Sequence, residues 1–230
     1  MQPENCPWTI YHGNYPYEFP ICERSLCEWI RQPANTWSNL GMVIIGLYLI
    51  FRGLRDRTES DIYLGSSIFI MGVCSFICHA SGTPLFVALD VTAIFIFLSL
   101  LSALLLLRGG MIAPKIAIIY FLAFFITALG VQIFLSKGQI LILILFIVLL
   151  AILEIKALNR IGEHINRRHL FYALVVLLVA AICIALDYTK TACFPDQHFF
   201  QFHALWHLLS GISMLLVANY MKQFKIKIFR

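Results

Sequence analysis

Two histidines four residues apart, His203 and His207, are the side chains whose type and spacing most directly favour chemistry. They stand at the start of the last apolar stretch, in the run His203-Ala204-Leu205-Trp206-His207. Residues four apart lie on one face of a helix, one turn above the other, so the two imidazoles can share a metal ion. The alternative is a pair of structural histidines beside a tryptophan, where a helix leaves the lipid.

A second pair with the same spacing, Ser75 and His79, lies near the end of another apolar stretch. A lone histidine at such a boundary usually has a structural role. Here His79 is expected at the same depth as His203 and His207, so it offers the third nitrogen that a catalytic zinc site needs. Three histidines leave the fourth position of tetrahedral zinc open for water. We therefore predict that these three side chains bind zinc.

One acidic residue, Asp90, stands among apolar neighbours a few residues after Pro84. It could be a carboxylate favoured by the dipole at a helix amino terminus. The histidines favour a second interpretation, in which Asp90 faces the metal as a general base toward water or as the partner of a ligand histidine. Asp187 also reaches this depth, but it falls at the end of a helix and is expected at the surface.

The elements that must position these side chains are membrane helices. Of the 230 residues, 60% are hydrophobic and 13% are charged, and the mean hydropathy is +0.85. A soluble domain carries about twice that charged fraction. Each membrane span takes roughly 20 apolar residues, so seven helices use most of the chain as one domain. The net charge of +5 is spread over short loops without a basic stripe, which argues against nucleic-acid binding.

Apolar runs separated by glycine, proline and basic residues predict an all-α, polytopic membrane protein with seven transmembrane helices. The expected ranges are 37–53, 61–80, 84–107, 113–135, 139–157, 168–187 and 199–221. The first helix is the weakest, because it opens with the polar run Thr36-Trp37-Ser38-Asn39. Residues 1–36 are then an amino-terminal segment, 37–221 the seven-helix bundle and 222–230 a basic tail.

Lysine and arginine are distributed unequally between the two sides of this bundle. Thirteen follow the first, third and fifth helices or lie in the tail, and four lie in the amino-terminal segment and the other loops. The basic side of a membrane protein faces the cytoplasm, so the amino terminus is expected outside and the carboxyl terminus inside. The predicted zinc ligands then lie toward the extracytoplasmic side. The remaining histidines lie in the basic loop or in solvated outer segments and are not predicted to bind metal: His12, His164, His169 and His198.

Cysteine use agrees with this orientation, because disulfides persist on the extracytoplasmic side. Cys6, Cys22, Cys27 and Cys193 are all expected there, whereas Cys74, Cys78 and Cys183 fall within helices. A bridge between Cys22 and Cys193 would tie the amino-terminal segment to the loop before the last helix. Four cysteines allow more than one pairing, and the sequence leaves the choice open.

An ordered set of motifs resembles the alkaline ceramidases, which belong to a superfamily of seven-helix membrane hydrolases that includes the progestin and adiponectin receptors. The set spans most of the chain and comprises Cys22-Glu23-Arg24, Pro33-Ala34-Asn35-Thr36-Trp37-Ser38-Asn39, Ser75 with His79, Asp90, and His203-Ala204-Leu205-Trp206-His207. The resemblance implies a catalytic zinc ion bound by the three histidines, with Asp90 activating the zinc-bound water and Ser75 stabilising the oxyanion. It implies cleavage of a ceramide-like lipid to a fatty acid and a sphingoid base.

The chain departs from the family at its calcium site. Members with such a site carry an acidic residue where this chain has Gln32, and acidic or amide residues where it has Pro20 and Ser25. Glu23 remains as a candidate calcium ligand. Because calcium prefers several carboxylate oxygens, replacing one by an amide weakens binding, so calcium regulation is not expected.

Other functions fit parts of the pattern. The same machinery could cleave another lipid amide or an ester, which only substrate trials distinguish from ceramide. A zinc-containing receptor should have a folded soluble region, and the loops here are short. A transporter should carry polar residues at the membrane midplane or a pair of broken helices, whereas these polar residues gather at one end. The sequence carries no signal for an oligomeric state.

Overall fold

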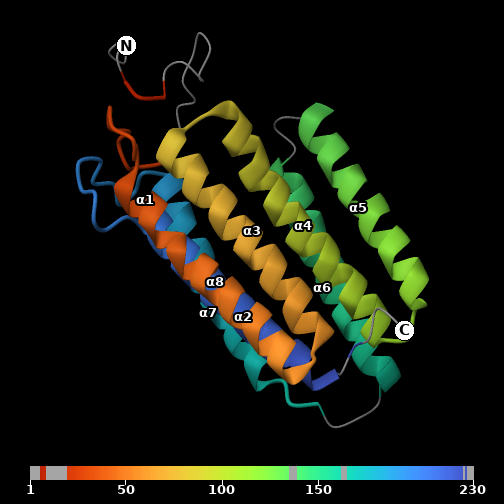
Figure 1. Ribbon diagram of the computed structural model, residues 1–230. Coiled ribbons are helices and arrows are strands. Elements are labelled where there is room, and N and C mark those ends of the chain that lie inside the picture. Colours follow the sequence, from red (N-terminus) through yellow and green to blue (C-terminus); the bar gives the residue numbers. More distant parts are fainter. Residues whose placement is uncertain (1–5, 9–19, 135–138, 162–164, 225, 227–230) are drawn as a thin grey trace.

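The architecture is a bundle of long, roughly aligned helices (Figure 1). The computed structural model describes residues 6–8, 20–134, 139–161, 165–224 and 226, with only the backbone of residues 131–134 and 139–142. Within these ranges the regular elements are all helical. They are α1 (Pro33–Ser38), α2 (Leu40–Asp56), α3 (Glu59–Ser81), α4 (Pro84–Arg108), α5 (Pro114–Phe134), α6 (Gln139–Ile161), α7 (Arg168–Tyr188) and α8 (Phe202–Met221), followed by a short 3₁₀ turn.

The predicted all-α fold is confirmed for the described residues, and each expected helix corresponds to one long helix. Five helical segments are long and apolar enough to cross a membrane: Pro33–Asp56, Glu59–Ser81, Pro84–Arg108, Arg168–Tyr188 and Phe202–Phe224. Another apolar helical segment, Pro114–Gly130, is shorter. Large apolar side chains of α7, including Leu174 and Leu178, point away from the protein. This composition indicates an integral membrane protein. The number of seven spans and the orientation stay predictions.

The helix expected at 37–53 differs most from the structure. It is divided at Asn39 into the short helix α1 and the longer helix α2. The Ser38 hydroxyl and the Asn39 side-chain amide both donate to the backbone oxygen of Asn35, at 2.8 Å each. Polar side chains that bond to nearby backbone groups compete with regular helical bonding. The polar opening that made this helix the weakest expectation is therefore a separate structural element.

Helices α2 and α3 are in close contact through glycines. A Cβ atom added to Gly46 would lie 2.6 Å from the backbone nitrogen of Phe69, and one added to Gly65 would lie 2.8 Å from that of Ile50. Only glycine permits such an approach of two backbones, as is common where helices pack within membranes. Helix α8 also contacts α2 and α3, and α7 packs along α8. This arrangement places the carboxyl end of α3 beside the amino end of α8.

Polar side chains are concentrated at both ends of the bundle, with an apolar core between them that includes Leu49, Leu64 and Ile68. At the end away from the amino-terminal segment, the Arg52 guanidinium forms two hydrogen bonds with the buried Asp61 carboxylate, of 2.7 and 2.9 Å. A second pair there joins Arg108 to Glu154 at 2.6 Å. These pairs connect helices, whereas the histidines that the sequence singled out lie at the other end.

Candidate metal centre

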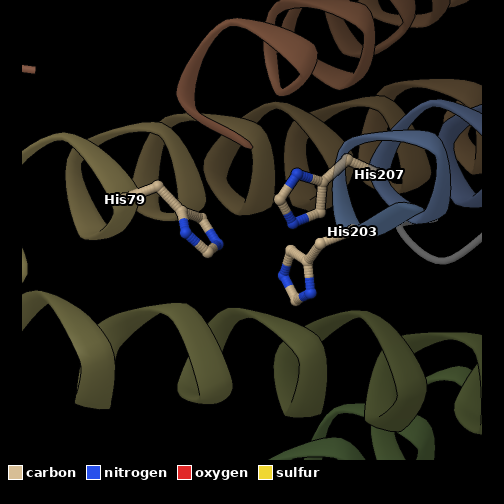
Figure 2. A group of neighbouring side chains, drawn as sticks. All are labelled: His79, His203 and His207. Carbon is tan, nitrogen blue, oxygen red and sulfur yellow. The ribbon is translucent and has the colours of Figure 1, made fainter. Parts of the chain in front are cut away.

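Three imidazole rings converge where α3 ends and α8 begins (Figure 2). His79 comes from the last turn of α3, and His203 and His207 from the first two turns of α8. Each ring contributes one nitrogen to a set whose members lie within 4.8 Å of one another, and all three residues are buried. Among the residues that the structure describes, this is the group of histidine, cysteine and acidic side chains that could hold a metal ion.

The local sequence explains how α3 and α4 are positioned at this site. Helix α3 ends at Gly82, whose φ of 61° lies in the left-handed region and whose N–H bonds to the Cys78 carbonyl. Glycine adopts this conformation without steric cost, which is typical of a helix carboxyl end. After Thr83, α4 starts at Pro84, and proline is well suited to a first helical position. The tight turn therefore brings the first turns of α4 beside His79.

The other ring nitrogen of two of these histidines is held by an oxygen atom. His79 Nδ1 lies 2.8 Å from Gln32 Oε1, and His207 Nδ1 lies 2.9 Å from Ser38 Oγ and 3.2 Å from the Asn35 carbonyl. The Gln32 amide nitrogen donates to the Glu23 carbonyl at 3.1 Å, so its Oε1 accepts from His79. A neutral imidazole whose Nδ1 donates presents the lone pair of Nε2.

The third ring, His203, has a carboxylate partner in place of an amide or hydroxyl. Its Nδ1 lies 3.5 Å from Asp187 Oδ2, which is longer than the other two pairs. Metal-binding histidines commonly direct their second nitrogen to a carboxylate or carbonyl oxygen, which fixes the tautomer and orients the ring. The donor set and its outer partners therefore fit a divalent metal that prefers imidazole nitrogen.

Ser75 and Asp90 lie beside the histidines. Ser75 is buried on α3, one turn before His79, and its hydroxyl is close enough to the Asp90 carboxylate to stabilise its charge. Asp90 is half-buried on α4 and is close enough to His203 to interact with it electrostatically. It is the seventh residue of α4. The helix dipole acts mainly on the first turn, so it does not account for a carboxylate at this position. The structure thus brings Ser75, His79, Asp90, His203 and His207 into one cluster.

The Glu23 carboxylate caps the short helix α1. Its two oxygens accept hydrogen bonds from the backbone N–H groups of Ala34 and Asn35, at 2.9 Å each. One of them also lies 3.1 Å from His198 Nδ1. The carboxylate that the sequence offered as a candidate calcium ligand therefore serves to hold α1, and α1 in turn carries the partners of His207.

Sequence reasoning missed the outer partners of the histidines. The expectation that Asp187 lies at the surface is wrong, because this residue is fully buried at the end of α7, where the amino-terminal segment contacts it through Cys22. In the sequence, Gln32 stands out only as a departure from a calcium site, and Ser38 only as a polar residue that weakens a span. The available signal was that all three are polar residues at the same end of the helices as the histidines. His198, expected to be exposed, is half-buried against Glu23.

Two disulfides fasten the amino-terminal segment. Cys22 pairs with Cys193 in the segment before α8, and Cys6 pairs with Cys27. Cys74, Cys78 and Cys183 are free thiols within helices. The Cys22 bridge joins residues 171 positions apart in the chain. It therefore connects the segment that carries Glu23 and Gln32 to the segment that leads into the histidines of α8.

Among the described residues, His169 lies apart from this cluster. His169, at the start of α7, lines a pocket of about 310 Å³ with Asn219 and Lys222, at the carboxyl end of α8. His12 and His164 lie outside the described residues.

Comparison with known proteins agrees with this architecture. The sequence model of the Ceramidase family matches residues 21–228, which include every residue of the cluster. The chain belongs to the Ceramidase family. Membership implies hydrolase activity toward a lipid substrate, with ceramide as the substrate that the family name indicates. No curated protein sequence matches the chain significantly.

Proposed function

We propose that this protein is a zinc-dependent membrane amidohydrolase that cleaves the amide bond of ceramide-like lipids to a fatty acid and a sphingoid base. One observation carries the proposal: three buried imidazoles from α3 and α8 converge within 4.8 Å. Burying polar rings in a membrane protein is costly unless they are paired or bind something. Three nitrogen ligands with one open position are the arrangement of catalytic zinc sites.

His79, His203 and His207 would bind the metal, and Gln32, Ser38 and Asp187 would orient their rings. Zinc bound there would supply Lewis acidity, which favours ionisation of water near pH 7 and polarises the amide carbonyl.

Asp90 is proposed as the general base and acid. Its carboxylate would take a proton from the attacking water as the new carbon–oxygen bond forms. It would then deliver this proton to the amide nitrogen as the carbon–nitrogen bond breaks, so that the sphingoid base leaves as an amine. The nearness of Asp90 to His203 supports a position next to the metal.

Ser75 is proposed to stabilise the negative charge that develops on the carbonyl oxygen. Its hydroxyl can rotate between the Asp90 carboxylate and a substrate oxygen, because the bond to Cβ is free to turn. A hydrogen bond aimed at a developing oxyanion typically contributes about 10²–10³ in rate.

A lipid substrate accords with the apolar helices around the site. Each buried methylene of an acyl chain contributes about 0.8 kcal/mol, so a long chain can supply most of the binding energy. Few polar contacts would then be needed to hold the amide group of the substrate at the site.

The test combines metal analysis with substrate trials on the purified protein. One zinc ion per chain and hydrolysis of ceramides in preference to N-acyl ethanolamines and esters are the expected results. His203→Ala should lose both zinc and turnover. His169→Ala should lose neither, because His169 lies near the opposite end of α8 from the cluster. Full zinc occupancy in His203→Ala would defeat the ligand assignment, and preferential ester cleavage would defeat the amide assignment.

A further inference from the structure

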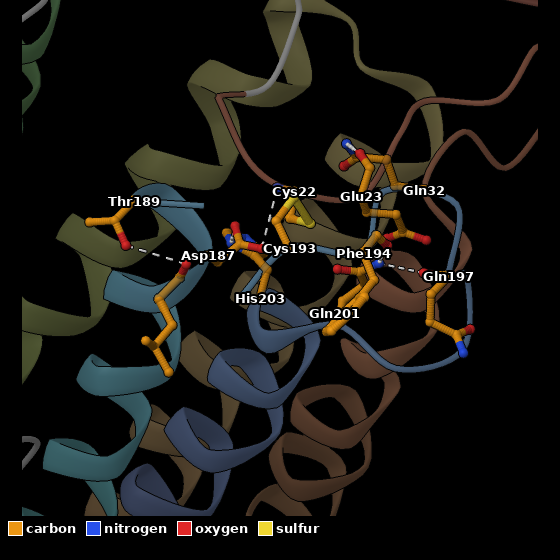
Figure 3. The surroundings of a disulfide bond; sticks show 11 residues. Cys22, Glu23, Gln32, Asp187, Thr189, Cys193, Phe194, Gln197, Gln201 and His203 are labelled. Carbon is orange, nitrogen blue, oxygen red and sulfur yellow. Dashed lines mark hydrogen bonds and ion pairs between the residues drawn. A yellow bond between two sulfur atoms is a disulfide. The ribbon is translucent and has the colours of Figure 1, made fainter. Parts of the chain in front are cut away.

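Asp187 is a fully buried carboxylate that faces both a proposed metal ligand and the amino-terminal segment (Figure 3). It lies at the end of α7, in the next-to-last position of that helix. Its Oδ1 accepts a hydrogen bond from the backbone N–H of Cys22 at 3.3 Å, and its Oδ2 lies 3.5 Å from His203 Nδ1. One carboxylate therefore connects Cys22 to His203.

The two atoms that face each other have no other hydrogen-bond partner among the described residues. Both Asp187 Oδ2 and His203 Nδ1 are buried, and neither forms a hydrogen bond of normal geometry. A buried polar atom without a partner carries an uncompensated desolvation cost. A small rotation of the His203 ring would bring the pair to hydrogen-bonding distance and remove this cost. Asp187 and His203 are thus arranged to form a hydrogen bond when the imidazole ring of His203 is held in one orientation. A metal ion bound to Nε2 of His203 would hold the ring in this way.

The Cys22–Cys193 disulfide holds the backbone group that bonds to Asp187. Cys193 belongs to the segment between α7 and α8, and the same segment accepts a hydrogen bond from the Arg24 N–H through the Pro195 carbonyl, at 2.9 Å. With the bridge intact, the Cys22 N–H is fixed relative to the ends of both α7 and α8. Without it, contacts between these two segments among the described residues would still include the Arg24–Pro195 backbone bond, the Arg24–Asp196 ion pair and the Glu23–His198 contact, and none of these involves Cys22.

We infer that Asp187 is a positioning residue for His203 and that the Cys22–Cys193 disulfide keeps Asp187 in place, so that retention of the metal depends on this bridge. The inference rests on the proposed function, because it assumes that His203 binds a metal ion. Asp187 does not touch the substrate in this account. It sets the direction of the imidazole and the tautomer that presents Nε2 to the metal.

The chain contains a matched control for the disulfide. The Cys6–Cys27 bridge also fastens the amino-terminal segment, whereas the hydrogen bond to Asp187 comes from Cys22. Loss of either bridge removes a covalent constraint on the unfolded chain and lowers thermal stability. A purely structural role for the Cys22–Cys193 bridge therefore predicts similar effects of the two losses on metal retention.

The experiment measures the rate at which the zinc-loaded, full-length protein loses zinc to a chelator, at a temperature well below unfolding. Outer partners of metal ligands commonly contribute 10–100-fold to metal affinity. We expect faster zinc loss, by about that factor, in Asp187→Asn and in the double variant Cys22→Ser/Cys193→Ser. The control Cys6→Ser/Cys27→Ser should stay within about twofold of the wild type. Combining Asp187→Asn with loss of the Cys22 bridge should add little, because both changes act on one contact.

The inference would be overturned if Asp187→Asn lost zinc at the wild-type rate, or if loss of either bridge accelerated zinc loss equally. It would also be overturned if the effects of Asp187→Asn and loss of the Cys22–Cys193 bridge were fully additive. If a variant does not fold, the Cys6→Ser/Cys27→Ser protein is treated after purification with a phosphine, which reduces the remaining bridge to two thiols and is itself oxidised. Zinc loss should then accelerate, and an unchanged rate would contradict the inference. A wild-type protein with zinc and ceramide hydrolysis but an insensitive Asp187 would refute this inference alone. A wild-type protein without metal would refute the proposed function as well.

Discussion

Gln32 offers the sharpest test of how the histidines are held, because its amide makes two directed contacts. Its Oε1 accepts from His79 Nδ1 at 2.8 Å and its Nε2 donates to the Glu23 carbonyl at 3.1 Å, with the side chain almost fully buried. The substitution Gln32→Met keeps the length of the side chain and removes both contacts. His79 Nδ1 and the Glu23 carbonyl then each lose one partner.

The expected magnitude follows from those two contacts. A buried polar group that loses its partner costs about 1–3 kcal/mol, so two such groups should lower the free energy of unfolding by roughly 2–6 kcal/mol. Loss of the oxygen behind His79 should weaken zinc binding by about 10–100-fold. Gln32→Glu should restore an acceptor for His79, but it places an oxygen against the Glu23 carbonyl. Zinc affinity should then recover more than stability does.

The assay is zinc affinity by competition with a chelator, measured beside thermal unfolding of the same samples. Gln223→Met is the control, because the amide of this glutamine donates to the backbone carbonyls of Asn166 and Tyr220 at the carboxyl end of α8, away from the histidines. The control should lower stability modestly and leave zinc affinity unchanged. Reduced stability with unchanged zinc affinity in Gln32→Met would refute a role for Gln32 in orienting His79.

Four further outcomes are expected. Asp90→Asn should retain zinc and lose about 10²–10⁴-fold in turnover, measured on ceramide with metal content as the control, and near-normal turnover would remove Asp90 as the general base. Gly46→Ala should destabilise the protein by about 1–3 kcal/mol in unfolding experiments, because its Cβ would meet the α3 backbone, whereas Gly130→Ala, with nothing within 4 Å, should be neutral or stabilising. Asp61→Asn should cost about 3–5 kcal/mol of stability, since it leaves the Arg52 charge buried without its carboxylate, and the apolar pair Arg52→Met/Asp61→Leu should recover most of this loss. Hydrolysis should be insensitive to a calcium-selective chelator, and a large loss that added calcium restores would contradict the expectation drawn from Gln32.

The sequence alone predicted the helices well, because each long apolar run has one physical solution within a membrane. Within lipid, every backbone group must be bonded internally, so such a run forms a helix. The boundaries were less predictable. The last helix was expected from residue 199, yet α8 begins at Phe202, because the Gln201 side chain donates to the carbonyls of Phe194 and Gln197 and keeps the preceding segment folded on itself.

The histidine cluster could be predicted because its members share a depth. His203 and His207 lie one turn apart on one helix, and the expected depth of His79 matched theirs without any knowledge of which helices are neighbours. The partners could not be predicted in this way. Asn35 and Ser38 reach His207 only because α1 packs against α3 and α8, and this packing is a property of the tertiary structure.

The two acidic residues near the cluster show the same limit. Both Asp90 and Asp187 lie at the depth of the histidines, and composition favoured Asp90 because it stands in the middle of an apolar run. The position of Asp187 at a helix end indicated exposure, but the amino-terminal segment covers that end through Cys22. The segment that buries Asp187 is distant in the chain, so this burial leaves no periodic pattern in the sequence.

Zinc-edge X-ray absorption of the purified protein tests the central claim most directly, because it reports the atoms that bind the metal. Three imidazoles and one water predict about four nitrogen or oxygen neighbours at roughly 2.0–2.1 Å, with outer-shell scattering from the imidazole rings. The nearby thiols of Cys74 and Cys78 should make no contribution. A sulfur neighbour near 2.3 Å, or a protein that is fully active without bound metal, would contradict the account.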